Sequence, residues 1–341
     1  MTRVYNIDVT ENECVKCLGD AISPYIQSGN INFLIGAGTS RPAINVLGNI
    51  EKTINKNLEA GEDEKANLEA FKFIRDMVAV DQSSGDTFET YVNFLKLLDD
   101  ILFKRQTPLL PRQATIFSTN YDLFIEHACT IVPSLILNDG FDRNVPLGKP
   151  VPFTPEKYFD RVYRSSSVYG HSAEMPSINL CKLHGSLSWS IIENSVKLRQ
   201  TAIELSSIKE TDADGIRSAL EQLALILPNL NKFNKTLLEG TYYDLLRIFA
   251  NALDRENSVL LVLGFSFDDE HILNITKRAL RNPTLKILIF AFNEDESKKY
   301  RKKFEAHRNV TIITPINKQK IKFKTFISIL GAIMPHRGSD T

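Results

Sequence analysis

The sequence predicts an α/β protein with a doubly wound, mostly parallel sheet and helical insertions. Six apolar runs have the length and composition of buried strands, and they lie at 31–35, 114–118, 178–183, 258–263, 285–292 and 310–314. Segments whose apolar residues recur at helical spacing separate these runs, as at 11–28 and 323–334. Because strands that alternate with helices build a parallel sheet, we expect a single α/β domain over residues 1–341.

Two longer stretches between the strands predict helical insertions, at about 45–110 and 195–255. Their apolar residues recur every three or four positions, at 58–80, 88–103, 216–227 and 242–253. By contrast, several prolines predict a loop at 138–155. We expect the inserted helices to form a cap or lid over a ligand site.

Composition and charge set the outer limits on function. With 43% hydrophobic and 24% charged residues, the chain is ordinary globular protein, and 41 basic residues balance 41 acidic ones. No apolar run reaches membrane-spanning length, and the N-terminus lacks the apolar core of a signal peptide. We therefore expect a cytoplasmic protein without membrane contact. A basic tract at 298–324 could dock an acidic protein or nucleic acid, or be a solvated surface.

Four cysteines are too few and too scattered for a disulfide framework. Cys14 and Cys17 form a single C-x-x-C, which could supply half a zinc site or a redox pair. A zinc site of this kind needs four ligands, and no second pair exists, so two buried thiols on one helix face are the simpler interpretation. We expect no metal.

The first strand candidate breaks into small residues at Gly36, Gly38 and Ser40. Glycines there allow the backbone to turn tightly and to approach a phosphate, and a helix that begins after Ser40 would direct its N–H groups at a pyrophosphate. The same residues also suit an ordinary tight turn. Arg41 replaces the third glycine of the dehydrogenase fingerprint, and no strand with an acidic end follows. The sequence therefore excludes the standard dinucleotide-binding motif of hydride-transferring dehydrogenases.

Polar or small residues also follow the next four strand candidates. They are Asn120 and Asp122, then His184, then Gly264 and Ser266, and finally Asn293. Because the carboxyl ends of parallel strands meet at one edge, we expect these residues to line one ligand site with the glycine loop. A histidine there is well placed for proton transfer, although histidines are also common structural residues. Asp122 could instead cap the helix that follows it.

Three of these motifs resemble, in the same order, those of the sirtuin family, the silent-information-regulator class of NAD-consuming enzymes. Gly36-Ala37-Gly38-Thr39-Ser40 is similar to its G-A-G-x-S phosphate loop. Thr119-Asn120-Tyr121-Asp122 resembles its T-Q-N-x-D motif, with one residue missing or with Thr in place of Gln, and His184-Gly185 matches the H-G pair that carries the catalytic histidine. The resemblance spans roughly 30–314, and the segment 263–272 is similar to that of bacterial sirtuin-like defence effectors.

The resemblance implies a Rossmann-like fold and cleavage of NAD between nicotinamide and ribose. Asn120 would hold a ribose hydroxyl or the attacking water, Asp122 would fix the nicotinamide carboxamide or the loop around it, and His184 would be the base. Such chemistry passes through an oxocarbenium-like state, which asks for a held ribose and a positioned nucleophile. The substrate NAD would be bound by Gly36, Ala37, Gly38, Ser40, Thr119, Gly264, Ser266 and Asn293.

Departures from the family separate this chain from the deacylating sirtuins. The two zinc-binding C-x-x-C pairs and the Phe-Gly-Glu strand of the acyl-lysine channel do not occur between Gly185 and Gly264. Arg41-Pro42-Ala43 replaces the family's G-I-P-D-F-R run. Without an acyl-lysine, water is the default nucleophile, so we expect an NAD glycohydrolase that releases ADP-ribose. A protein deacylase, an ADP-ribosyltransferase, or a non-catalytic sensor of NAD or ADP-ribose are the alternatives.

The resemblance also implies a setting for this activity. Relatives act in anti-phage defence by abortive infection, depleting NAD, often as homo-oligomers. They work with an ATPase of the DNA-translocase type or an Argonaute-type protein. Because an unrestrained NAD glycohydrolase would kill the cell that makes it, we expect a partner or an assembly to switch this protein on.

Overall fold

The apolar runs form one parallel sheet in the computed structural model, which describes residues 2–44, 48–105, 109–165, 170, 172–199, 201, 203–226 and 235–333. Its 8 strands all pair with their neighbours in the parallel direction. In spatial order they are β1 (Arg3–Ile7), β14 (Val310–Pro315), β13 (Lys286–Phe290), β12 (Ser258–Leu263), β2 (Asn30–Ile35), β3 (Gln113–Ser118), β8 (Ser177–Lys182) and β4 (Ile136–Asn138). The predicted fold class, a doubly wound α/β sheet, is confirmed.

The six central strands have the order of the Rossmann fold. Counted along the chain, β2, β3, β8, β12, β13 and β14 lie in the spatial order 3-2-1-4-5-6, and β1 and β4 extend the two edges. The order reverses between β2 and β12, where Ile35 pairs with Leu263 at the carboxyl ends of both strands. Ligands of open α/β sheets bind at such a reversal, so the fold itself points to this edge.

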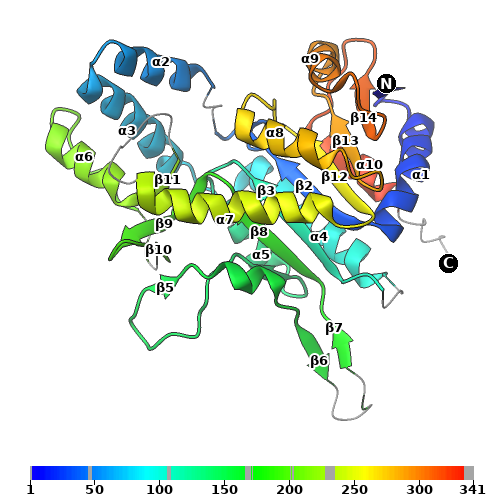
Figure 1. Ribbon diagram of the computed structural model, residues 1–341, viewed down its shortest axis with the longest axis horizontal. Coiled ribbons are helices and arrows are strands. Elements are labelled where there is room, and N and C mark those ends of the chain that lie inside the picture. Colours follow the sequence, from blue (N-terminus) through cyan, green and yellow to red (C-terminus); the bar gives the residue numbers. More distant parts are fainter. Residues whose placement is uncertain are drawn as a thin grey trace.

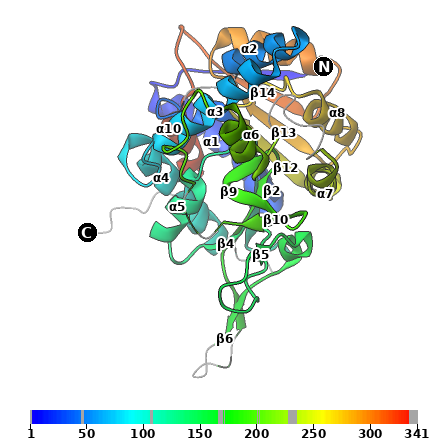
Figure 2. The same ribbon diagram turned by 90° about the vertical axis from the view of Figure 1, so that its left-hand side faces the viewer.

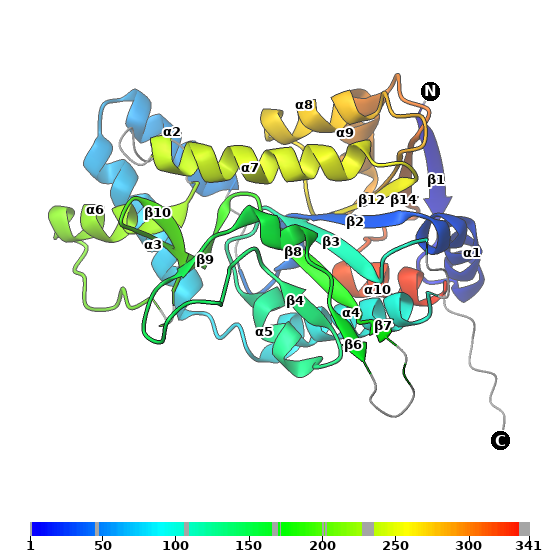
Figure 3. The ribbon, with the colours of Figure 1, turned by 60° about the horizontal axis from the view of Figure 1, so that its bottom comes forward.

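Helices cover both faces of the sheet (Figures 1 and 3). One face carries α1 (Asn12–Ser28), α4 (Gly85–Phe103), α5 (Phe124–Ile131) and α10 (Phe323–Gly331), and the other carries α7 (Lys235–Asp254), α8 (Glu270–Ala279) and α9 (Glu294–Phe304). Alternate strand residues fill the two cores. Phe33 meets Phe94 of α4 at 5.2 Å between ring centroids, whereas Leu34 packs into the core under α7.

A smaller lobe lies at one end of the sheet (Figures 1 and 2). It contains α2 (Gly48–Glu59), α3 (Asp63–Ala79), α6 (Ala213–Glu221) and the antiparallel strands β11 (Leu223–Leu225), β9 (Gly185–Ile192), β10 (Ser195–Leu198) and β5 (Val151–Pro152). Because β9 continues from the carboxyl end of β8, this lobe borders the carboxyl ends of the parallel strands. Past the turn η2 (Pro155–Phe159), the hairpin of β6 (Tyr163–Ser165) and β7 (Ser172–Glu174) projects from the body (Figure 1).

The insertions differ from the predicted helical lids. α4 belongs to the core, because its side chains Tyr91, Phe94 and Leu95 are fully buried in the hydrophobic cluster on one face of the sheet. The second insertion, predicted as helical at about 195–255, also contains β10 and β11, so that prediction was wrong in part. The apolar run of β11 continues the helical spacing of α6, but pairing with β9 makes it a strand. Residues 45–47, 106–108 and 227–234 of the predicted insertions lie outside the described residues.

None of the described helices is long and apolar enough to cross a membrane. The thiols at the N-terminus also differ from expectation, because Cys17 is exposed and Cys14 is only partly buried on α1. Cys14 donates to Oε2 of Glu11 at 3.1 Å. Within the described ranges, no group of three or more His, Cys, Asp and Glu side chains could hold a metal ion.

Candidate active site

The loops that follow β2, β3 and β12 join at the carboxyl edge of the sheet. The backbone N–H of Gly36 donates to Leu263 at 3.0 Å, and that of Gly38 donates to Gly264 at 3.1 Å. On the other side, the N–H of Thr119 donates to the carbonyl oxygen of Ile35 at 3.1 Å. Three predicted site segments, far apart in sequence, are therefore in direct contact.

The two glycines of the first loop lie against the loop that follows β12. A Cβ at Gly36 would lie 2.4 Å from the carbonyl oxygen of Gly264, and a Cβ at Gly38 would lie 2.9 Å from its Cα. The glycines thus let two protein loops pack closely. The loop continues as a single 3-10 turn, η1 (Ala37–Thr39), and the next helix begins only at Gly48. The helix expected directly after Ser40 is not there, and the helices that begin at this edge are α5, α8 and α9, which follow β3, β12 and β13.

Gly38→Ala is accordingly expected to destabilise the fold by about 1–3 kcal/mol, because the added methyl group must displace the backbone of Gly264. Urea unfolding measures the change. Gly331→Ala on α10 is the matched control, since a Cβ there meets no atom within 4 Å. A Gly38→Ala protein of wild-type stability that binds NAD poorly would restore the phosphate-cradle interpretation.

Asn120 is held against the glycine loop by its side-chain amide. Nδ2 donates to the carbonyl oxygen of Gly36 at 3.2 Å and to Oγ of Ser40 at 3.1 Å. The other end of the amide differs, because Oδ1 is buried and has no hydrogen-bond partner among the described residues. Leaving a buried acceptor unpaired costs about 1–3 kcal/mol, and such orphans in native proteins call for a functional explanation. Asn120 thus offers a fixed acceptor to a ligand hydroxyl or water.

The carboxylate of Asp122 also holds the glycine loop. It is 3% exposed, and its Oδ2 accepts a hydrogen bond from Oγ of Ser40 at 2.6 Å. The hydroxyl of Tyr91 from α4 lies 3.0 Å from the same Oγ, and burial raises the pKa of Tyr91 far above its usual value. The possible role of Asp122 as a helix cap is wrong, because α5 starts at Phe124 and its N-terminus has no side-chain cap. Asp122 instead fixes the glycine loop.

His184 follows β8 and pairs with a carboxylate from the loop after β12. Its Nε2 lies 2.9 Å from Oδ2 of Asp269, and both side chains are largely buried. The other oxygen of Asp269 accepts from the N–H of Ile272 at 3.1 Å and so caps α8. Burial raises the pKa of Asp269, but the bonds from His184 and the backbone outweigh it, and its pKa is lowered. With Nε2–H donating to this carboxylate, Nδ1 carries the lone pair of a base.

Of the remaining predicted binding residues, one caps a helix and two are at least partly exposed. Asn293 caps α9, because its Oδ1 accepts from the N–H of Glu296 at 2.9 Å. Ser266 is exposed, and its carbonyl oxygen accepts from Lys303. Ala37 is partly exposed on the rim of the loop. Asn293 therefore has its side chain committed to a structural bond.

The sequence missed three side chains that organise the site: Tyr91, Lys182 and Asp269. Tyr91 joins the loop network from a helix predicted as a lid. Lys182 could have been noticed in the sequence, since it is the one charged residue in the apolar run at 178–183. Asp269 lies in an acidic cluster after the fourth strand, but nothing in the sequence indicated that it meets His184.

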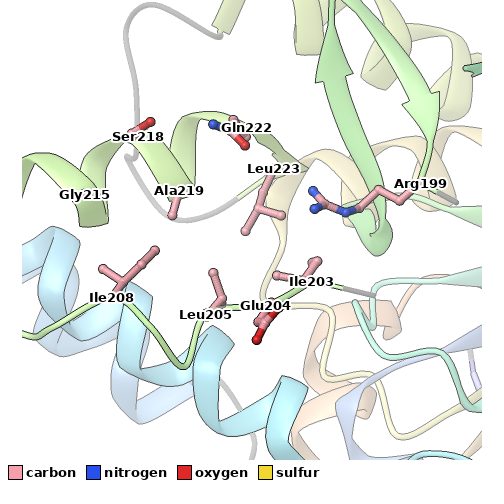
Figure 4. Close-up of a pocket in the computed structure, with 10 residues that line it drawn as sticks. All are labelled: Arg199, Ile203, Glu204, Leu205, Ile208, Gly215, Ser218, Ala219, Gln222 and Leu223. Carbon is pink, nitrogen blue, oxygen red and sulfur yellow. The ribbon is translucent and has the colours of Figure 1, made fainter. Parts of the chain in front are cut away.

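The small lobe contains a hollow of about 200 Å³ between α6 and the segment after β10 (Figure 4). Its wall is mixed, with Ile203, Leu205 and Leu223 beside polar residues, and Arg199 points toward Leu223. None of the predicted site residues lines it. The hollow is therefore separate from the strand ends described above.

Comparison with known proteins agrees with the geometry. The chain matches the SIR2-like domain family over residues 114–313, more than half of its 341 residues. This range includes Asn120, His184 and Asp269 and begins after the glycine loop. No curated protein sequence matches the chain. The protein belongs to the SIR2-like domain family, whose members are NAD-dependent enzymes.

Proposed function

We propose that the protein is an NAD glycohydrolase, which cleaves NAD to nicotinamide and ADP-ribose. The observation that carries this proposal is the pairing of His184 with Asp269 at the edge where the strand order reverses. A carboxylate that fixes the tautomer of a partly buried histidine is typical of a general base. The nearby acceptor Oδ1 of Asn120 supplies a second fixed polar group.

The reaction needs few groups. The bond between C1′ of the ribose and the ring nitrogen breaks, and nicotinamide leaves as a neutral molecule with the electron pair. The oxygen of a water molecule bonds to C1′, and its proton passes to Nδ1 of His184. Asn120 Oδ1 accepts a hydrogen bond from the ribose hydroxyl or the water. Positioning by these residues supplies most of what an oxocarbenium-like transition state requires.

Asp122 has a supporting part in this proposal. Because its carboxylate is buried and bonded to Ser40, its proposed part is to hold the loop. Binding of the NAD phosphates and ribose is assigned to exposed or partly exposed groups of the loops, at Ala37, Thr119 and Ser266. The N–H groups of Gly36 and Gly38 and the carbonyl oxygen of Gly264 are already used between the loops.

Incubation of the purified chain with NAD, followed by chromatography of nicotinamide and ADP-ribose, tests the proposal. Equal amounts of the two products without any peptide support hydrolysis. A deacylase would require an acylated peptide, an ADP-ribosyltransferase would label a protein, and a sensor would bind NAD without turnover. Any of these three results contradicts the proposed activity.

We further propose that the enzyme is a regulated effector of anti-phage defence. The proposal rests on the resemblance of its motifs to those of defence effectors and on the danger of unrestrained NAD cleavage. Three lysines of the basic tract, Lys298, Lys299 and Lys303, form ion pairs with Asp295, Glu296 and Asp268 at 2.7–3.1 Å, which weakens their attraction for DNA and for an acidic protein alike. We propose that self-association or a protein partner is the trigger.

Nicotinamide release by the chain alone is expected to be slow at low concentration and to rise more steeply than in proportion to protein concentration. Addition of a partner ATPase of the DNA-translocase type, or of an Argonaute-type protein with its nucleic acid, is expected to raise the rate further. The measurement is turnover per chain across a dilution series, with and without each addition. Full turnover by a dilute monomer, unchanged by any addition, would contradict this form of control.

A further inference from the structure

Lys182 places an ammonium group in the protein interior beneath the proposed site. It is the last residue of β8 and is 1% exposed. Burial of an ammonium is costly unless its protons find acceptors. Nζ donates to the carbonyl oxygens of Asn120, at 3.3 Å, and of Asp122, and it lies 3.3 Å from Oε1 of Glu126. The three protons of the ammonium therefore meet three acceptors.

These acceptors belong to the segment that carries the proposed site residues. The two carbonyl groups are those of Asn120 and Asp122 themselves, and Glu126 lies in the first turn of α5, directly after the loop. Oγ of Ser186 lies 3.4 Å from Oε1 of Glu126, and Ser186 is only two positions after His184. Through Lys182 and Glu126, polar contacts thus connect the Asn120 loop with the His184 loop.

Stability alone does not explain this ion pair. A well-packed apolar pair of similar volume is often as stable as a buried ion pair, or more stable, because no charge has to leave water. Burial raises the pKa of Glu126 in spite of the nearby ammonium, and its Oε2 has no hydrogen-bond partner among the described residues. The pair therefore carries an energetic cost, which a gain in the precise placement of the loop can offset.

We infer that Lys182 is a positioning residue for Asn120 and that Glu126 is its counter-ion. By holding the carbonyl groups of Asn120 and Asp122, the ammonium fixes the direction in which Oδ1 of Asn120 points. This inference rests on the proposed function as far as turnover is concerned. Its structural content, the fixed orientation of the Asn120 side chain, can be tested without turnover.

The variant to test combines Lys182→Met with Glu126→Gln, so that neither charge is left buried without its partner. The expected result is a folded protein whose kcat for nicotinamide release falls on the order of 100-fold, because misplacement of a catalytic group by about 1 Å has an effect of that size. KM for NAD is expected to stay close to that of the wild type, since Asn120 acts mainly in the transition state. Unchanged kcat would overturn the inference.

Hydrogen exchange gives the second readout. In protein labelled with ¹⁵N-asparagine, the side-chain amide signal of Asn120 is assigned by its loss in Asn120→Ala. Its protons are buried and bonded in the wild type and are expected to exchange faster in the double variant. If the wild type releases no nicotinamide under any condition, the proposed function fails, and this exchange rate still decides the positioning role. Equal exchange rates in both proteins would overturn it.

Arg105→Met is the matched control. Arg105 is also a buried cation, 6% exposed, that donates to backbone carbonyl oxygens, those of Ile26, Gly29 and Pro111. These carbonyl groups lie at the amino ends of the strands, opposite the proposed site, because Gly29 immediately precedes β2. Loss of Arg105 is expected to lower the melting temperature with no change in kcat or in the exchange of Asn120. A loss of kcat equal to that of the Lys182 variant would assign both cations to stability alone.

Discussion

His184→Ala and Asn120→Ala are each expected to reduce nicotinamide release by about 10²- to 10⁴-fold, the range of general acid–base and fixed-dipole catalysis. Removal of the imidazole leaves the attacking water without a base, and removal of the amide leaves the ribose or water without its fixed acceptor. The fold is expected to survive both changes. Gly36 keeps its bond from Thr39, and Ser40 keeps those to Tyr91 and Asp122 when the amide is lost.

Steady-state release of nicotinamide and thermal unfolding followed by circular dichroism measure the two quantities. His307→Ala and Asn309→Ala are the controls of matching chemistry. Both residues precede β14 at the amino edge of the sheet, and Asn309 makes two bonds of 3.2 Å to backbone carbonyl oxygens there. The controls are expected to keep wild-type turnover. Wild-type turnover in His184→Ala or Asn120→Ala would contradict the assignment of that residue.

The parallel sheet could be predicted from sequence because its central strands are buried on both faces. Such strands are continuous apolar runs, and this signal does not depend on which strand is the neighbour. β1 gives no such signal, because Arg3–Ile7 is an edge strand that is mostly exposed and pairs only with β14. β10 and β11 are three or four residues long, and their pairing with β9 decides their conformation. Local sequence does not contain that information.

The candidate site, like the fold, could be predicted only in part from local sequence. Sequence placed Asn120, His184 and the glycine loop at strand ends, since position along one strand is a local property. Which side chains meet across strands is a property of the tertiary structure. His184 and Asp269 are 85 positions apart, and the Ser40 and Asp122 pair is 82 positions apart. The packing role of the glycines could not be predicted for the same reason, because the neighbour that requires them is Gly264 of another loop.

Asp269→Asn is the second change with a large expected effect, a fall in kcat of up to about 10⁴-fold. An asparagine can still accept the N–H of Ile272 and cap α8. Toward His184, however, it can present an N–H donor, which favours the tautomer with the proton on Nδ1. A base with its proton on the wrong nitrogen accounts for a loss of this size in serine proteases, where the corresponding change was made. KM for NAD is expected to change little.

The dependence of stability on pH separates this role from simple helix capping. The pKa of Asp269 is lowered below 3.8 in the folded protein, so its ionised form stabilises the fold above that pH, and the stabilisation is lost as pH falls through the folded pKa. The urea midpoints of wild type and Asp269→Asn are therefore expected to differ at pH 5 and to converge as the pH falls below 3.8. A variant that keeps wild-type kcat while its stability falls in this way would make Asp269 a cap of α8 and leave His184 without an orienting partner. Loss of kcat together with convergence at low pH assigns both functions to one carboxylate, with one oxygen holding the helix and the other holding the base.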